Sequence, residues 1–139
     1  GGLDQALDDT VREFSERGGF QVLLQSEPLA VNLSASEQIH LLQIAREALS
    51  NCARHAHAQQ VNVHLRQQGE QIELHIEDDG CGISSDFDTR QHHGLGIMEE
   101  RTRSLHGSIR IEPRSPRGTR VVLQFRPEFL VSHTGENIS

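Results

Sequence analysis

Hydrophobic positions in the first half of the chain follow helical spacing twice, with a short strand-like run between. Apolar residues recur every three or four positions from Leu3 to Arg17, which predicts a helix that ends at a glycine pair. Residues 20–25, FQVLLQ, are typical of a strand. A second, longer helix is predicted to begin at Ser34 or Ser36 as N-cap and to run to about His57. Its expected core-facing stripe is Ile39, Leu42, Ile44, Ala45, Ala48, Leu49 and Cys52.

The second half of the chain alternates apolar and polar residues in four short runs. Residues 60–67 and 71–78 predict one hairpin with a single buried face, and residues 108–114 and 119–125 predict another. Between the hairpins, residues 94–107 fit a helix that is closed by its last glycine. This order of elements predicts an α+β fold, with a mixed, mostly antiparallel sheet covered by helices on one face.

Composition and charge narrow the class of protein. The 139 residues fit a single folded unit that needs no disulfide or metal to stabilise it. The net charge of −7, without any lysine, argues against a nucleic-acid partner, because phosphate backbones are bound by clustered basic residues. Cys52 and Cys81 are expected to be reduced, as in a cytoplasmic domain. No apolar run approaches the roughly 20 residues that span a bilayer, so no direct membrane contact is expected.

The stretch EALSNCARHA places unusual chemistry on the long helix. Glu47, Asn51 and Arg54 follow one another at spacings of four and three residues and share a face, which His55 borders. Asparagine is a poor residue for a helix interior, and its carbonyl is a hard oxygen ligand suited to Mg²⁺. Arginine can hold phosphate oxygens. A merely solvated face with an ion pair is the competing interpretation.

Three glycine-containing segments could complete a binding site. In DDGCGI, Asp78 ends a strand and could accept a hydrogen bond from an exocyclic amine such as that of adenine, while Gly80 and Gly82 let the backbone approach a flat ligand. An ordinary Asp-Gly turn is the alternative. Gly94 and Gly96 are expected just before a helix, whose free N–H groups would face a phosphate.

The third segment is the Gly-Thr pair at the start of the last strand. The Thr119 hydroxyl could reach the same amine, or a water held by Asp78, if the two strands lie side by side. Each of these segments is weak evidence when it is taken alone, and their joint occurrence carries the interpretation.

Together the four segments resemble the ATP-binding catalytic domain of sensor histidine kinases, in the wider group of gyrase-type, Hsp90-type and MutL-type ATPases. EALSNCARHA resembles the N box, DDGCGI the G1 box, GLGI a shortened G2 box, and the Gly-Thr pair the last G box. The similarity extends over nearly all of the expected folded region. LLQIAREALSNCARHAHAQQVNV and HGLGIMEERTRSLHGSIRI further resemble the nitrate/nitrite sensor kinases. The implied fold is the two-layer α/β sandwich of that group.

The resemblance implies a role for each motif residue. Asn51 would coordinate Mg²⁺ bridging the phosphates of ATP, with Glu47 as its acidic partner and a possible second ligand. Arg54 and His55 would approach the phosphates. Asp78 would bind the adenine amine, assisted by Thr119. The remaining residues of the implied nucleotide site are Gly80, Gly82 and Ile83 at the adenine, and Gly94, Leu95 and Gly96 where a lid meets a phosphate-facing helix.

The resemblance also implies partners that this chain does not contain. The phosphoacceptor histidine of sensor kinases lies on a separate helical hairpin, and no histidine here stands in such a context. Residues 1–17 would lead out of that hairpin, residues 18–128 would form the ATP-binding catalytic domain, and residues 129–139 would be a disordered tail. The implied enzyme is a protein histidine kinase that signals to a LuxR-type response regulator.

The parent protein would be a homodimeric inner-membrane receptor with this domain in the cytoplasm, and the domain alone would be a monomer. Two other functions stay open at this point: an ATPase or serine kinase of the same ATP-binding group, and a non-catalytic nucleotide-binding docking module.

Overall fold

The computed structural model describes residues 2–17, 19–56, 58–80 and 89–128, with side chains except at residues 55–56 and 89–95. Five strands form one sheet in the order β1-β2-β3-β5-β4. Strand β1 runs parallel to β2, whereas the other neighbouring strands are antiparallel. The strands are β1 (Gln21–Ser26), β2 (Gln60–Gln68), β3 (Gln71–Asp78), β4 (Ser108–Pro113) and β5 (Thr119–Phe125). The predicted mixed, mostly antiparallel sheet is therefore confirmed.

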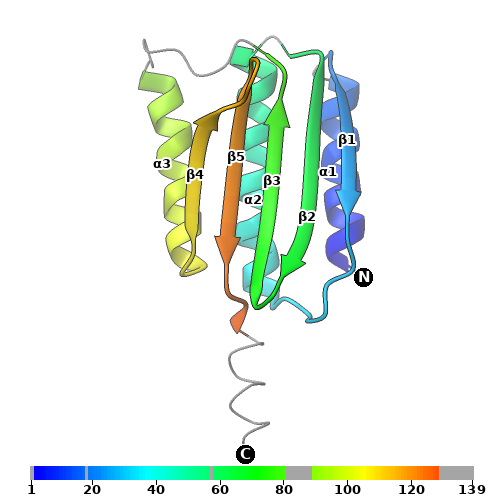
Figure 1. The fold of residues 1–139 in the computed structure, drawn as a ribbon, viewed down its shortest axis with the longest axis vertical. Helices are drawn as coiled ribbons and strands as arrows, with labels where there is room; N and C mark the ends of the chain where they lie inside the picture. Colours follow the sequence, from blue (N-terminus) through cyan, green and yellow to red (C-terminus); the bar gives the residue numbers. More distant parts are fainter. Residues whose placement is uncertain (1, 18, 57, 81–88, 129–139) are drawn as a thin grey trace, which may run out of the picture.

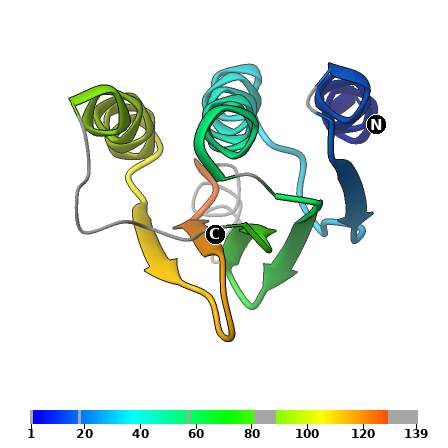
Figure 2. The ribbon, with the colours of Figure 1, turned by 90° about the horizontal axis from the view of Figure 1, so that it is seen from above.

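Helices cover one face of this sheet. The helical layer consists of α1 (Gly2–Arg17), α2 (Ala35–Asn51) continued by a π-helical turn η1 (Cys52–Ala56), and α3 (Thr89–Ser104). Seen from above, α1, α2 and α3 lie side by side over the sheet, and no helix of the described residues lies on its other face (Figures 1 and 2). Among the described residues, no helix has both the length and the apolar character needed to cross a membrane. The single layer of helices on one face of the sheet confirms the predicted α+β fold.

The core lies between the two layers and follows the predicted alternation of the central hairpin. The inward residues of β2 and β3 are all buried, namely Val61, Val63, Leu65, Ile72, Leu74 and Ile76. Helix α1 contributes Leu3, Leu7 and Val11 to the same core. The first helix therefore packs as part of the layered structure.

The predicted stripe of α2 is wrong at its N-terminal end. Ile39 is 55% exposed, while Leu41, which the prediction omitted, is completely buried. The observed stripe is Leu41, Ile44, Ala45, Ala48, Leu49 and Cys52, which follows the spacing of three and four residues without a break. Ile39 lies two residues before Leu41 and so points to another side of the helix.

The predicted start of the third helix is also wrong. Helix α3 begins at Thr89, so Gly94 and Gly96 lie inside it and not before it. A glycine in a helix interior costs only about 1 kcal/mol relative to alanine, which neighbouring helix formers such as Arg90 and Gln91 can offset. The backbone N–H groups of the two glycines are consequently not at the free N-terminus that the sequence interpretation assumed.

Candidate nucleotide-binding site

Three chain segments that are far apart in the sequence meet at one end of the sandwich. Helix α2 ends there at Asn51, strand β3 ends at Asp78, and strand β5 begins at Thr119 (Figure 1, upper end). The π-helical turn η1 continues α2 at this end. Such turns are often found at functional sites, because they change the direction in which side chains leave the helix.

The last turns of α2 and the η1 turn bring together three of the predicted site residues. The Arg54 guanidinium donates a hydrogen bond of 3.0 Å from Nη2 to Asn51 Oδ1. The same nitrogen lies 3.7 Å from Glu47 Oε2, close enough for an ion pair but too far for a hydrogen bond. The predicted common face of Glu47, Asn51 and Arg54 is therefore present, and the arginine lies across both acceptors.

Glu47 carries an unusual oxygen within this cluster. Its Oε2 is buried and has no hydrogen-bond partner in the described part of the chain. A buried carboxylate oxygen without a donor is costly, so a water, a cation or a ligand donor is expected to satisfy it. Among the described residues, no three His, Cys, Asp or Glu side chains form a metal cluster. Mg²⁺ commonly takes one or two protein oxygens and completes its shell with phosphates and water, so the oxygens of Glu47 and Asn51 fit this ion.

Asp78 is held rigidly at the end of β3. The residue is only 5% exposed. Its Oδ1 accepts a hydrogen bond of 2.9 Å from the Gly80 backbone N–H, and its Oδ2 lies 3.6 Å from the thiol Sγ of Cys52, which donates to it. Both oxygens keep a further lone pair, so the carboxylate can still accept a hydrogen bond from a ligand.

The start of β5 lies directly beside Asp78. Thr119 is the antiparallel partner of Asp78 in the sheet, so the predicted neighbourhood of the two residues is present. Gly118, just before it, has φ +111°, and a Cβ there would overlap the Asp78 carbonyl oxygen and lie 2.9 Å from the carbonyl carbon. Only glycine fits this close approach.

Two contacts of this end of the sheet were missed by the sequence interpretation. The Asp79 carboxylate accepts hydrogen bonds from the backbone N–H groups of Gln59 and Gln60 at 2.9 and 3.0 Å. These bonds, that of Gln60 above all, lower the pKa of Asp79. In the β4–β5 turn, Arg117 Nε donates to the Gly80 carbonyl oxygen at 3.1 Å. The second aspartate of the Asp78-Asp79 pair was visible in the sequence as a candidate for such contacts, whereas no sequence pattern linked Arg117 to Gly80.

Several predicted site residues are not tested by this geometry. Gly82 and Ile83 lie outside the described residues, as do the side chains of His55 and Leu95. Gly96 lies in α3, and its Cα faces open space with no other atom within 4 Å of a built Cβ.

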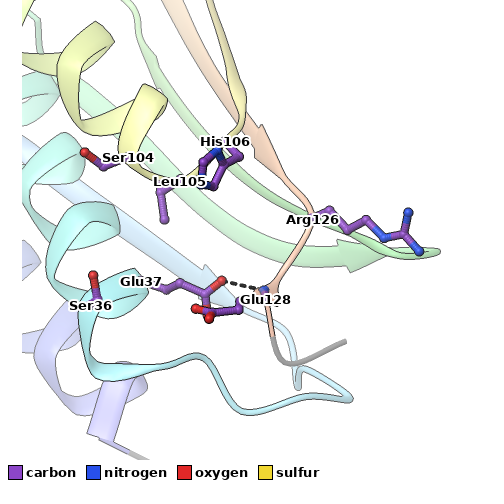
Figure 3. Close-up of a pocket in the computed structure, with 7 residues that line it drawn as sticks. All are labelled: Ser36, Glu37, Ser104, Leu105, His106, Arg126 and Glu128. Atoms are coloured by element: carbon purple, nitrogen blue, oxygen red, sulfur yellow. Dashed lines mark hydrogen bonds between the residues drawn. The ribbon is translucent and has the colours of Figure 1, made fainter. Parts of the chain in front are cut away.

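A separate pocket of about 500 Å³ lies at the opposite end of the sandwich (Figure 3). It is lined by Ser36, Glu37, Ser104, Leu105, His106, Arg126 and Glu128. Its buried carboxylate, Glu37, is already occupied, because Oε1 accepts from the Ser34 N–H and Oε2 accepts from the Glu128 N–H. None of the predicted site residues lines this pocket.

The chain belongs to the family described as histidine kinase-, DNA gyrase B-, and HSP90-like ATPases, whose pattern matches residues 36–128. The matched range includes the end of α2, the end of β3 and the start of β5, where the candidate site lies. The predicted histidine-kinase type of ATP-binding domain is thereby confirmed at the level of the family.

Individual relatives are sensor kinases. The chain is 40% identical over 127 residues to the nitrate/nitrite sensor protein NarX of Escherichia coli K12, covering 91% of this chain and 21% of that protein. It is 34% identical over 119 residues to the sensor histidine kinase ComP of Bacillus subtilis strain 168, covering 84% of this chain and 16% of ComP. The predicted similarity to nitrate/nitrite sensor kinases is confirmed, although the chain spans only about a fifth of the length of these relatives.

Solved structures agree on the fold. The histidine kinase domain of the Erythrobacter litoralis EL346 blue-light activated histidine kinase superposes with a TM-score of 0.76 at 23% identity, covering 90% of this chain and 61% of that one. At this identity the likeness concerns the fold alone.

Proposed function

We propose that this chain is the nucleotide-binding half of a sensor histidine kinase, which binds Mg-ATP and donates the γ-phosphate to a histidine on a separate helical hairpin. The observation that carries the proposal is the meeting of an Asn-Arg-Glu cluster on α2 and η1 with a buried Asp78 on β3, in a chain of this ATPase family.

At the adenine end, Asp78 accepts a hydrogen bond from the exocyclic amine, and Thr119 assists it from the neighbouring strand. An ionised carboxylate offers acceptors only, so it favours an amine and disfavours a carbonyl at the same place on the base. Gly80 and Gly82 form the floor of the pocket, with Ile83 beside the base. This selects adenine over guanine nucleotides.

At the phosphate end, Asn51 Oδ1 and Glu47 Oε2, which accepts no hydrogen bond from the described residues, are the oxygens that would hold Mg²⁺. When bound, the ion neutralises charge on the phosphates and fixes their orientation. Arg54 exchanges its hydrogen bond to Asn51 for a bond to phosphate oxygen, with His55 nearby. Gly94, Leu95 and Gly96 contribute the α3 side of the site.

The chemistry is a transfer between two protein parts. An imidazole nitrogen of the hairpin histidine attacks the γ-phosphorus, the bond to the bridging oxygen breaks, and ADP leaves with that oxygen. The contribution of this domain is placement of the γ-phosphate in line and stabilisation of its charge, since phosphoryl transfer needs little else from a protein.

The proposed partners follow from the separation of the nucleotide-binding domain from the phosphoacceptor hairpin. The hairpin belongs to the same parent protein, a homodimeric inner-membrane receptor that senses nitrate or nitrite and passes the phosphate to an aspartate of a LuxR-type response regulator. This chain is a cytoplasmic domain and a monomer in isolation. Residues 1–17 lead out of the hairpin.

The test supplies a matching hairpin in trans, together with γ-labelled ATP and Mg²⁺. We expect label on the hairpin that is lost in acid and kept in base, because phosphohistidine is acid-labile. The Asn51→Asp variant should transfer at least tenfold more slowly, since a second carboxylate beside Glu47 repels the phosphates. Acid-stable label would indicate a serine kinase instead, and ATP binding without any labelling would indicate a docking module.

A further inference from the structure

Cys52 is a buried nucleophile that the proposed mechanism does not use. It is 6% exposed and starts the π-helical turn that follows Asn51. The thiol forms no disulfide with the described residues, and it donates a hydrogen bond to the Asp78 carboxylate, 26 residues further along the chain. The contact joins the two halves of the candidate site, because Asn51 is the neighbour of Cys52 and Asp78 is the expected reader of the base.

We propose that Cys52 is a positioning residue for nucleotide selection. Its thiol fixes the orientation of the Asp78 carboxylate so that this group accepts a hydrogen bond from an exocyclic amine. The proposal rests on the function proposed above, in which Asp78 contacts adenine. It extends that function to a residue that touches neither the base nor the phosphates.

The geometry leaves the carboxylate with one defined orientation. A carboxylate at a strand end can rotate about its last side-chain bond, and that torsion is broad and about two-fold. Here the Gly80 N–H holds Oδ1 at 2.9 Å, and the Cys52 Sγ, at 3.6 Å, holds Oδ2. Two donors on two different oxygens determine the plane of the group, whereas one donor would leave it free to turn.

The thiol can act only as a donor in this place. A thiol with its ordinary pKa of about 8.5 carries its proton in neutral solution. A protonated thiol beside a carboxylate donates its S–H to it. The weakness of this donor is compensated by the low exposure of both groups, because a hydrogen bond is stronger away from water.

Three variants separate positioning from packing. Cys52→Ala removes the donor and leaves a small cavity, and Cys52→Ser keeps a donor. Val63→Ala makes a cavity in the same core, on the inward face of β2, where Val63 pairs with Ile76 and not with Asp78. Calorimetry on the 139-residue chain with Mg²⁺ would compare ATP, GTP and the triphosphate of purine riboside, which lacks the amine. Thermal melts would show that each variant is folded.

We expect Cys52→Ala to lower ATP affinity about five- to tenfold, the value of one hydrogen bond, while purine riboside triphosphate binding changes less than about twofold. Cys52→Ser should restore the preference for ATP over purine riboside triphosphate, and Val63→Ala should leave it unchanged.

The proposal is overturned if Cys52→Ala weakens all three nucleotides equally, as a packing defect would, or if it changes none of them. Failure of the underlying function looks different: the parent chain would then show no preference for ATP, and Asp78→Asn would have no effect on binding. That result would contradict both proposals. If the parent chain prefers ATP and the Cys52→Ala variant keeps the same preference, only the proposal about Cys52 is contradicted.

Discussion

At the scale of single residues, Gly118 shows how the sheet shapes the candidate site. Its φ of +111° lies where residues with a side chain are strained, and the space that a Cβ would need is filled by the backbone of Asp78. Gly19 also has a positive φ, +72°, but a Cβ there would meet open space, with none of the described residues beyond its chain neighbours within 4 Å. Comparison of the two glycines therefore distinguishes the free-energy cost of the backbone conformation from the cost of steric overlap.

Substitution by alanine should reveal this difference. Gly19→Ala is expected to lower the free energy of unfolding by about 1 kcal/mol, for the left-handed backbone alone. Gly118→Ala should cost more than about 3 kcal/mol, because the end of β3 must move as well. Urea denaturation followed by circular dichroism measures both. Equal losses in the two variants would contradict the close approach of Gly118 to Asp78.

Glu73 is a second residue with an unusual environment, on the sheet face that carries no helix. It is 5% exposed, and its carboxylate accepts hydrogen bonds from Arg66, His75 and Gln124 at 3.0, 3.0 and 2.7 Å. Burial alone would raise the pKa of Glu73, but the bonds from His75, Gln124 and Arg66 outweigh it and lower the pKa to about 2.

This predicts a specific acid sensitivity. An unfolded glutamate has a pKa of about 4.3, so the stabilisation by ionised Glu73 is present above that pH and is lost as the pH falls towards 2. The loss amounts to at most about 3 kcal/mol. Unfolding free energies of a Glu73→Gln variant should therefore fall less between pH 5 and pH 2, by about that amount.

Glu70→Gln is the matched control, because the side chain of Glu70 is 56% exposed and pairs only at the surface with Arg126. We expect it to follow the pH profile of the parent chain. An unchanged profile for Glu73→Gln would show that the Glu73 network contributes nothing to acid stability.

How far the sequence predicts single residues depends on whether the cause is local. Glu47, Asn51 and Arg54 could be placed on one face because helical spacing is a local property. The contact of Cys52 with Asp78 could not be predicted, since it depends on how α2 docks against the end of β3. The place of Gly118 was visible in the sequence, but its necessity follows only from the pairing of β3 and β5.

At the scale of elements, the N-terminus of α2 is fixed by a reciprocal pair of hydrogen bonds. The Ser34 Oγ accepts from the Glu37 N–H at 3.1 Å, and Glu37 Oε1 accepts from the Ser34 N–H at 2.9 Å. This is a capping box, in which two backbone donors without a helical partner are satisfied. The sequence left Ser34 and Ser36 as alternatives, and the structure selects Ser34.

The two serines provide a matched test of this cap. Ser34→Ala should lower the free energy of unfolding by about 1 kcal/mol, because the Glu37 N–H loses its acceptor. Ser36→Ala, two residues into the exposed first turn, should change it by less than about 0.5 kcal/mol. Chemical denaturation of both variants is the measurement. A larger loss in Ser36→Ala would contradict the assignment of Ser34 as N-cap.

The elements whose apolar period is clear were predicted with nearly correct bounds. Strands β2 and β3 and their buried faces follow directly from alternation. The start of α3 was missed because two glycines resemble a boundary signal, while the polar residues before them carry no apolar period. Ile39 was misplaced because a hydrophobic residue one position outside a stripe is difficult to distinguish from a member of it.

At the scale of the whole molecule, the layered fold places the candidate site at one end and structural contacts at the other. Helix α2 links the two: its capped N-terminus binds the backbone of Glu128, and its C-terminal turns carry Asn51. The order of helices and strands was sufficient to predict one helical layer on a mixed sheet. The order of strands in that sheet, with β5 between β3 and β4, comes from long-range pairing and could not be read from the chain.

The central claim is that this end of the molecule binds Mg-ATP through Asp78 and Asn51. Calorimetric titration of the 139-residue chain with ATP, ADP and GTP, each with Mg²⁺, tests it most directly. We expect both adenine nucleotides to bind at least tenfold more tightly than GTP. Asp78→Asn should remove this preference, and Asn51→Asp should weaken the binding of Mg-ATP. Undetectable binding of ATP and ADP, or undiminished ATP affinity in the Asp78 variant, would contradict the claim.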